Sequence, residues 1–535
     1  MVGQARPMRS VPSFVLVSVL IACSGQTPPP SPAAQSESSP PALDVVELSA
    51  VEARDRMAAG TLTSRVLTQA YLDRIKQIDD SGPMLNAVIE INTTAIADAE
   101  ALDAERKSGK VRGPLHGIPI LVKDNIDIVG MANSAGSLAL ADNRPKQDAF
   151  IVTRLRDAGA VILGKTNLSE WANFRSTRST SGWSSRGGQT KNPYALDRNP
   201  CGSSSGTGAA IAASLASIGI GTETDGSIIC PASVNGLVGL KPTVGLVSRR
   251  GIIPISVTQD TAGPMARSVA DAAMLLTALA AVDAGDPATE SAKDRIPDDY
   301  GVLQRDAFKA RRLGVLRQAT GYHPDVDSAF NAAVDVIKSL GGVVVDVKIP
   351  EYDAWNGPEL EVMLYEFKDG LNQYLKATGS PHASLEALIG FNKTHADTVM
   401  PFFGQELFER AQAKGSLTDA AYLKAREDAM RLAGSHGLLA ALEGDHLDAI
   451  IAPSSSPAWL IDHVLGDHFV GAGYSMAAIA RTPSISVPIG DSHGLPLGLT
   501  IMGRAYAERD VIAMGYSIEQ AMHARKPPQF RAAVP

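Results

Sequence analysis

Residues 201–227 read CGSSSGTGAAIAASLASIGIGTETDGS, and this stretch decides both the fold and the kind of site. A loop rich in serine and glycine stands at each end, so that Ser203 and Ser227 are 24 residues apart. Between them, an alanine-rich pattern predicts a short helix, and the apolar residues that follow predict a short strand. Glycine and serine allow tight turns and the close approach of a substrate. The stretch therefore predicts a nucleophile site.

The same alternation of helix and strand continues on both sides of this stretch. Helices alternating with short apolar strands predict an α/β sheet that is covered by helices on both faces. The chain has no internal repeat and no second linker, so we expect one catalytic domain over 43–525, followed by a C-terminal tail at 526–535. Residues 350–445 are mostly helical and polar in pattern, which favours an insertion over the site.

The individual elements follow from periodicity and from end signals. Asp148 is expected to cap the second of the predicted helices. Helices are predicted at 64–78, 148–157, 328–340 and 508–522, and strands at 160–163, 343–345, 449–452, 484–487 and 497–501.

The composition excludes one class of partner. The chain has 535 residues, a net charge of −8 and 5% aromatic residues. Nucleic-acid binding needs a basic face and often aromatic stacking, so we expect no nucleic-acid partner. The serine-rich loop also lacks the lysine of a phosphate-binding loop, and we expect neither a cofactor nor a metal.

The N-terminus resembles a bacterial lipoprotein signal. Residues 1–23 begin with positive charges at Arg6 and Arg9, continue with an apolar run over 12–22 and end at Cys23. The apolar run is too short to span a bilayer stably. We expect lipidation at Cys23 and an exported enzyme anchored at the cell envelope, periplasmic or associated with the outer membrane. An uncleaved anchor or ordinary secretion are the alternatives, and both also place the enzyme outside the cytoplasm.

Residues 24–42 are rich in proline and serine. Such a segment cannot bury enough apolar surface to fold, so we expect a disordered linker that joins a lipid to the catalytic domain. The membrane contact is then made through the lipid anchor alone.

Cys201 and Cys230 flank the two serine loops. Cysteine packs as a small hydrophobe, which favours two small buried side chains. A catalytic thiol and, in an oxidising compartment, a disulfide between the two cysteines stay open as alternatives.

Two other motifs are weaker than they look. Residues 202–206 match G-x-S-x-G with Ser204 as nucleophile, but that motif requires a strand running into it, and 197–201 predict a loop. His463 and His468 stand near two aspartates, yet their spacing fits no helical ligand pair, which favours a surface or pocket-lining loop. His116 is interpreted as structural.

Lys123 ends the apolar run 118–122. A lysine at the end of a strand is often a surface residue that extends its amine to water. Two serine loops downstream change this interpretation, because a buried lysine can act as a base when it is neutral. Its pKa would have to fall from about 10.4 to roughly 7–8.

Taken together, these motifs resemble the amidase signature enzymes. The matching segments are GIPILVKDNID around Lys123, CGSSSGTGAA around Ser203 and GTETDGSIICPAS around Ser227. The resemblance covers about residues 45–525, and within the family the chain is most similar to bacterial peptide amidases. It implies a large mixed and twisted sheet as the core of the fold.

The resemblance also implies a Lys–Ser–Ser triad. Lys123 would be the base, Ser203 the relay that follows a cis peptide bond, and Ser227 the nucleophile. The oxyanion would be bound by the backbone N–H groups of Thr224, Asp225, Gly226 and Ser227.

The expected activity is the hydrolysis of a carboxylic amide to an acid and ammonia through an acyl-enzyme, with C-terminal peptide amides as substrates. Cys201 and Asp225 stand where relatives usually have glycine, so the substrate preference is open at this place. The alternatives are another amidase-signature hydrolase for fatty acid, aliphatic or aryl amides, a component of an amidotransferase, and a non-catalytic lipoprotein that binds at the cell surface.

Overall fold

The computed structural model describes residues 12–18, 20, 43–301 and 303–534. The chain divides into two compact units, Met1–Ala42 and Leu43–Pro535. The predicted lipidation site Cys23 and the predicted linker at 24–42 lie outside the described residues, as does most of the predicted signal. Within the described ranges, no helix has the length and apolar character needed to cross a membrane.

The second unit is built on one sheet of 11 strands, in the order β1-β3-β2-β6-β8-β7-β12-β13-β11-β9-β10. Two short strands form a separate hairpin. The strands of the large sheet are β1 (Val88–Ile91), β2 (Pro119–Lys123), β3 (Val161–Thr166), β6 (Ile218–Glu223), β7 (Val238–Lys241), β8 (Thr261–Ala266), β9 (Arg312–Leu316), β10 (Val343–Val347), β11 (Ala449–Pro453), β12 (Ser484–Ser492) and β13 (Leu495–Met502), and those of the hairpin are β4 (Trp183–Ser184) and β5 (Gly188–Gln189).

The large sheet is mixed, as predicted. Strands β3, β2 and β6 are parallel, and so are β11, β9 and β10. Between these two parallel groups, β6, β8, β7, β12, β13 and β11 pair antiparallel. Strands β2, β3 and β6 are buried along their whole length, which is typical of parallel strands covered on both faces.

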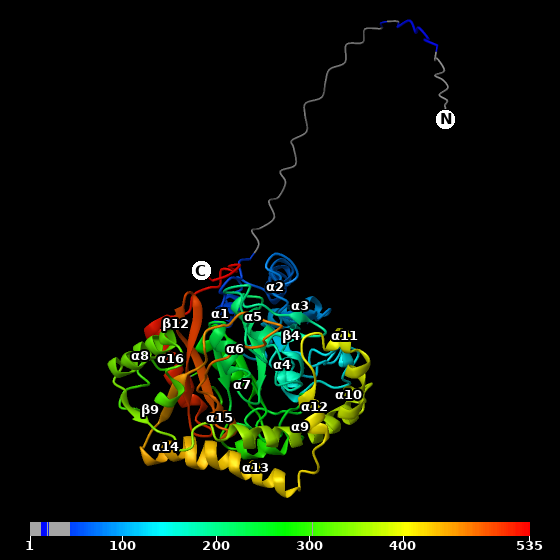
Figure 1. Cartoon of the computed structure of the whole chain (residues 1–535). Helices are drawn as coiled ribbons and strands as arrows, with labels where there is room; N and C mark the ends of the chain where they lie inside the picture. Colours follow the sequence, from blue (N-terminus) through cyan, green and yellow to red (C-terminus); the bar gives the residue numbers. More distant parts are fainter. Residues whose placement is uncertain (1–11, 19, 21–42, 302, 535) are drawn as a thin grey trace, which may run out of the picture. The chain divides into compact units, whose positions relative to one another are not determined.

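Helices cover both faces of this sheet (Figure 1). In β12, Ile485 and Val487 lie against Gly515 of α16, whereas the neighbouring Ser486 faces the other side, where Gly498 of β13 meets Ser233 of α6. The helices are α1 (Ala50–Ala58), α2 (Ser64–Ile78), α3 (Ala95–Lys107), α4 (Phe150–Asp157), α5 (Ser205–Ala212), α6 (Ile229–Val234), α7 (Val269–Leu279), α8 (Pro324–Ser339), α9 (Asn356–Thr378), α10 (Leu385–Thr394), α11 (Ala396–Val399), α12 (Glu406–Gln412), α13 (Ala420–Met430), α14 (Leu439–Gly444), α15 (Ser475–Ile479) and α16 (Glu508–Met522).

Short non-α turns complete the set of elements. A π-helical segment, Arg431–Leu438, joins α13 to α14, and it contains a non-helical residue at Gly437. The 3₁₀ turns are Leu138–Leu140, Glu170–Asn173, Pro287–Ala292 and Arg317–Ala319.

The predicted elements are confirmed with one correction. Helices α2 and α16 have the predicted ends, and every predicted strand is present, most of them longer than expected. The predicted cap of α4 is wrong, because Ala149 occupies the N-cap position and makes no side-chain cap. The carboxylate of Asp148 instead accepts hydrogen bonds from Val129 N (2.7 Å) and Arg156 Nε (2.8 Å). It therefore ties the loop at residue 129 to the last turn of α4.

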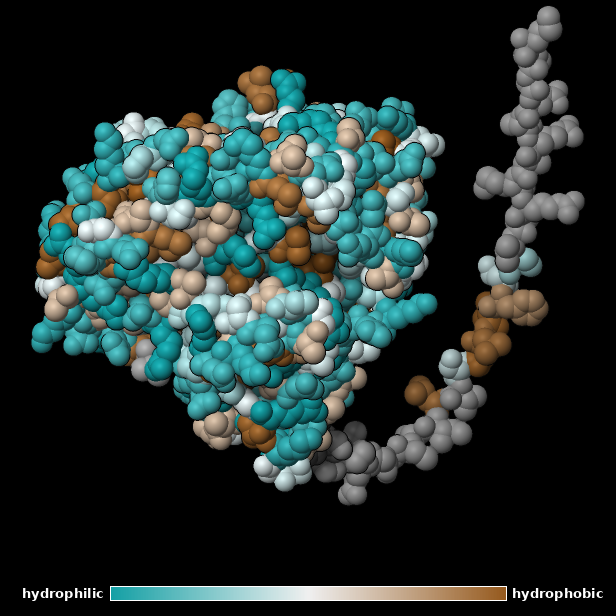
Figure 2. All heavy atoms as spheres, turned by 90° about the horizontal axis from the view of Figure 1, so that it is seen from below, coloured by the Kyte–Doolittle hydropathy of each residue, from teal (hydrophilic) through white to brown (hydrophobic). Residues whose placement is uncertain are grey.

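The predicted helical region at 350–445 is confirmed as α9 to α14, and α9 and α13 lie side by side (Figure 1). Gly370, Gln373 and Tyr374 of α9 line the cavity of the candidate site, so this region does lie over the site. The residues after 525 pack on the same unit, since Phe530 N donates to Pro193 O and Leu196 N donates to Arg531 O. The face drawn in Figure 2 is mainly hydrophilic, with hydrophobic residues in scattered groups.

Candidate active site

Lys123 is the last residue of β2, which lies between β3 and β6. Because both neighbours are buried strands, the end of β2 is also inside the molecule, and the Lys123 side chain is 0% exposed. The alternative of a surface lysine is therefore wrong.

The Lys123 amine is surrounded by hydroxyl groups. Its Nζ donates to Ser203 Oγ (2.8 Å), Ser204 Oγ (3.0 Å), and both Oγ1 (2.9 Å) and the carbonyl oxygen (3.2 Å) of Thr222. Burial lowers the pKa of Lys123 to about 7, against the opposing effect of the carboxyl groups of Glu223 and Asp260. Near neutral pH, the amine can therefore be either charged or neutral.

Ser203 lies in the loop before α5 and follows a cis Gly202–Ser203 peptide bond. Ser169 packs directly against this bond: a Cβ on Gly202 would lie 2.1 Å from Ser169 Oγ, and Ser169 N donates to Ser203 O (3.2 Å). Residues 197–201 form no strand, so the rejection of the G-x-S-x-G elbow is confirmed. Ser204, the residue which that motif would use, donates its hydroxyl to Thr222 O (3.1 Å).

Ser227 lies in the loop between β6 and α6. Gly226 has φ +76°, and a Cβ there would lie 2.2 Å from the ring of Tyr474, so only glycine fits. The Glu223 carboxylate accepts hydrogen bonds from Ile228 N (2.7 Å) and Ile229 N (3.0 Å), which fixes the first turn of α6. This glutamate was not predicted from the sequence.

The two serine loops are joined to each other, because Ser204 N donates to Ser227 O (3.2 Å). Within the described ranges, no hydrogen bond links the hydroxyls of Ser203 and Ser227, and the N–H groups of Thr224, Asp225 and Ser227 donate to no protein acceptor. These three N–H groups are free to bind a ligand oxygen next to the Ser227 hydroxyl.

Two cavities meet at Ser227. The first, of about 300 Å³, reaches inward to Ser203, Asn125 and Thr222. The second, of about 350 Å³, has Asp225 and a set of aromatic side chains in its wall. Both are lined by Ala172, Thr224, Ser227 and Ile255. An acyl group attached at Ser227 can extend into either cavity.

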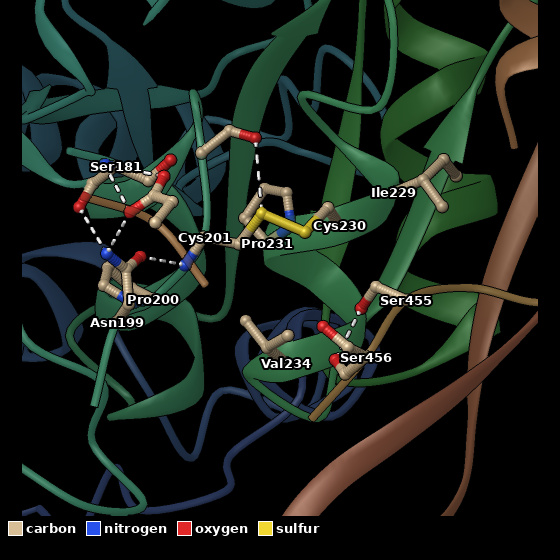
Figure 3. The surroundings of a disulfide bond; sticks show 12 residues. Ser181, Asn199, Pro200, Cys201, Ile229, Cys230, Pro231, Val234, Ser455 and Ser456 are labelled. Carbon is tan, nitrogen blue, oxygen red and sulfur yellow. Dashed lines mark hydrogen bonds between the residues drawn. A yellow bond between two sulfur atoms is a disulfide. The ribbon is translucent and has the colours of Figure 1, made fainter. Parts of the chain in front are cut away.

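Cys201 and Cys230 form a disulfide, with 6.0 Å between their Cα atoms (Figure 3). The favoured interpretation of two small unpaired side chains is therefore wrong, and neither sulfur is available as a catalytic thiol. The bond joins the loop before Ser203 to α6, the helix that follows Ser227. The sequence left the disulfide open, since a separation of 29 positions between the cysteines carries no information on their distance in space.

Both histidine interpretations are confirmed. His116 bonds through its ring nitrogens to Leu102 O (2.9 Å) and Arg112 N (3.2 Å), which makes it a structural residue. His463 stacks on Phe402 and bonds to Gln189 Oε1 (3.0 Å) in a loop. Over the described ranges, no group of three or more His, Cys, Asp and Glu side chains is placed to hold a metal.

Thr222 and Asn125 are site residues that sequence reasoning missed. Thr222 Oγ1 contacts Lys123 Nζ and accepts a hydrogen bond from Asn125 Nδ2 (3.0 Å). A signal for both was present: β2 and β6 are parallel neighbours, and the residues at their carboxyl ends meet at one edge of the sheet.

The comparison with protein families matches the Amidase model over residues 66–512. A probable amidase of Arabidopsis thaliana is 39% identical over 485 residues, which are 88% of this chain and 89% of that protein. A glutamyl-tRNA(Gln) amidotransferase component of Salinispora arenicola is 34% identical over 508 residues, 91% of this chain and 99% of that protein. The chain therefore belongs to the amidase signature family and is an amide hydrolase.

Solved structures agree with this placement. A peptide amidase in complex with the competitive inhibitor chymostatin is 53% identical, covers 90% of this chain and 99% of its own, and superposes with a TM-score of 0.89. The native peptide amidase of Stenotrophomonas maltophilia is 52% identical with a TM-score of 0.87, and the match covers 90% of this chain and 99% of that one. Both likenesses confirm the predicted resemblance to peptide amidases.

Proposed function

We propose that Ser227 attacks the amide carbonyl and that Lys123 removes its proton through Ser203. The observation that carries this proposal is the buried Lys123 amine, which lies 2.8 Å from Ser203 Oγ and forms no ion pair with a carboxylate of the described residues. A serine hydroxyl needs a base to attack an amide, and lysine can serve only when it is neutral. A pKa of about 7 supports this role at neutral pH.

Each step of the proposed reaction has a named group. Lys123 accepts the proton of Ser203, Ser203 accepts that of Ser227, and Ser227 forms a bond to the carbonyl carbon. Catalytic hydrogen bonds in a free enzyme are often longer than in the complex, so Ser227 would close on Ser203 when substrate binds. Ser203 then returns a proton to the departing ammonia, and water hydrolyses the acyl-enzyme.

The oxyanion would be bound by the backbone N–H groups of the Ser227 loop. Those of Thr224, Asp225 and Ser227 have no acceptor within the described part of the chain, which supports this role. The N–H of Gly226, the fourth member of the predicted set, faces the Glu223 carboxylate instead, and this carboxylate holds the loop in place. One donor of this kind contributes about 3–4 kcal/mol to the transition state.

We propose C-terminal peptide amides as substrates. The peptide amidase that is 53% identical over 90% of this chain supports this choice, and so do the two cavities at Ser227, which leave room for more than one residue. Other amide hydrolysis and transfer of ammonia are the alternatives, the latter because a glutamyl-tRNA(Gln) amidotransferase component is also a relative.

Ammonia release from a panel of amides tests both parts of the proposal. The panel contains an N-acetyl dipeptide amide, a fatty acid amide, an aryl amide and glutamine. Wild type should act best on the dipeptide amide, and Ser227→Ala should lose about 10⁶-fold in kcat. Full activity in Ser227→Ala would show that Ser227 is not the nucleophile. Equal rates of wild type on the fatty acid amide and the dipeptide amide would exclude C-terminal peptide amides as the preferred substrates.

We further propose that the enzyme is exported and carries a lipid at Cys23. The disulfide between Cys201 and Cys230 supports export, because disulfides persist in oxidising compartments. Metabolic labelling with a fatty acid should mark the wild type and leave Cys23→Ala unlabelled, and label in both proteins would contradict the anchor.

A further inference from the structure

The geometry points to a cation-binding subsite in the second cavity at Ser227, where Asp225 recognises an ammonium or guanidinium group on the acyl part of the substrate. This inference rests on the proposed function, since it concerns the acyl group that Ser227 would carry. It names a specificity-determining residue, and it predicts which amides are preferred.

The position of Asp225 is the first argument. Asp225 lines the second cavity together with Ser227, two residues further along the chain. A substrate held at Ser227 thus brings the groups next to its scissile carbonyl close to the Asp225 carboxyl.

The Asp225 carboxyl has a hydrogen-bond partner in Ser475, but one of its two oxygens has none, and this is the second argument. Its Oδ1 is buried and accepts no hydrogen bond from any described residue. Among the described residues, Asp225 also forms no ion pair, and neither does the neighbouring Glu359. A buried acceptor without a donor is costly, and a ligand that supplies an N–H group removes that cost.

The surrounding charge is the third argument. Burial and Glu223 raise the pKa of Asp225 to about 7, and burial and Asp225 raise the pKa of Glu359 well above its usual range. The buried ammonium of Lys241 lowers the pKa of Asp225, but it makes no hydrogen bond to this carboxyl. Its Nζ donates instead to Thr482 O (2.5 Å) and Pro242 O (3.1 Å). A bound cation would lower the pKa of Asp225 and stabilise its charged form.

The walls of the cavity fit an organic cation. Phe174, Trp459, Phe469 and Tyr474 line it, and the described lining includes no lysine, arginine or histidine. Aromatic faces attract ammonium and guanidinium groups. The other carboxylate of the lining, Asp467, is already satisfied by Ser181 N, Asn199 Nδ2 and Trp459 Nε1, so it holds the wall in place.

The first cavity lacks this character. Arg249 and Arg250 line it, and they form ion pairs with Asp286 (2.5 Å) and Asp283 (2.9 Å). Glu223 and Asp260 also line this cavity, but a cationic group placed there would meet the two arginines.

Two kinds of substrate carry the required cation. One is a peptide amide that ends in arginine or lysine, and the other is an amino acid amide with a free α-ammonium group. Two matched pairs of probes separate these sources: N-acetyl-glycyl-arginine amide against its uncharged citrulline isostere, and leucine amide against N-acetyl-leucine amide.

The test compares kcat/KM within each pair for wild type, Asp225→Asn and Asp462→Asn. Wild type should prefer the charged member of at least one pair by about tenfold or more. Asp225→Asn, which keeps the shape of the side chain, should reduce that ratio to near one, whatever its absolute rate. Asp462→Asn should keep the wild-type ratio, because Asp462 lies outside the cavity lining and caps an exposed turn.

Each outcome decides the inference. A wild type without preference in either pair overturns it, and so does an Asp225→Asn protein that keeps the full preference. The pair that responds identifies the source of the cation. Absence of ammonia from every amide in wild type would instead refute the proposed function, which keeps the two failures distinct.

Discussion

Lys123 and Lys165 lie on adjacent parallel strands, and both side chains are 0% exposed. In the register of β2 and β3, Lys165 pairs with Val122, so the two lysines point to opposite faces of the sheet. Burial lowers the pKa of both amines. Both sites therefore contain a lysine whose amine is removed from water.

Their partners differ. Lys165 Nζ donates to the carbonyl oxygens of Ile126 (2.6 Å) and Ala132 (3.2 Å), and it forms an ion pair with Asp124 (3.2 Å). These groups accept hydrogen bonds from an ammonium but cannot pass a proton to it. The hydroxyls around Lys123 can both accept and donate, so of the two amines only that of Lys123 has neighbours able to pass a proton to it.

Of the two lysines, Lys123 should produce the larger effect on activity when it is substituted. Lys123→Met removes the proposed base and should reduce kcat by about 10²–10⁴-fold, measured by ammonia release. Lys123→Arg should be equally inactive, because a guanidinium keeps its proton in proteins. A fully active Lys123→Arg enzyme would show that the charge, and not a neutral amine, is what the site needs.

The same change at Lys165 should act on stability. Lys165→Met removes one of the two cations that pair with the buried Asp124, the other being Arg186, and leaves the carbonyl oxygens of Ile126 and Ala132 without their donor. Together these losses should cost about 3–5 kcal/mol in the free energy of unfolding. The folded fraction should keep its kcat, since Lys165 does not contact the serine loops. As a control, Lys338→Met removes an exposed ion pair with Asp335 and should cost about 0–1 kcal/mol. Equal melting temperatures for the two variants would contradict this contrast.

The pH dependence of activity should also distinguish Lys123 from Lys165, with a smaller effect than the substitutions have. The base works when it is neutral, so kcat/KM on an uncharged amide should fall about tenfold per pH unit below a midpoint near 7 and level off above it. Lys165→Met should leave this midpoint unchanged. A flat profile through neutral pH would mean that Lys123 does not titrate in the rate-determining step.

Local signals in the chain predicted the elements well. Leu67, Tyr71 and Ile75 repeat at helical spacing, and α2 has the predicted ends because its apolar face is also its buried face. The predicted N-cap of α4 was wrong. Asp148 belongs to a residue type that often caps helices, but its carboxylate accepts hydrogen bonds from Val129 and Arg156 instead. Capping preference is a local rule, and a tertiary contact overrode it.

The candidate site likewise has features that follow from local sequence and features that depend on tertiary contacts. The order and spacing of its motifs identified Lys123, Ser203 and Ser227 as candidates, since residue type and neighbouring pattern are local properties. The disulfide, the hydroxyls of Ser204 and Thr222 around the amine, and the acidic wall at Asp225 depend on residues far apart in the chain. Sequence alone determined the elements and the candidate catalytic residues. The packing of β2 between β3 and β6 decided the burial of the Lys123 amine, and it is this burial that lowers its pKa to about 7.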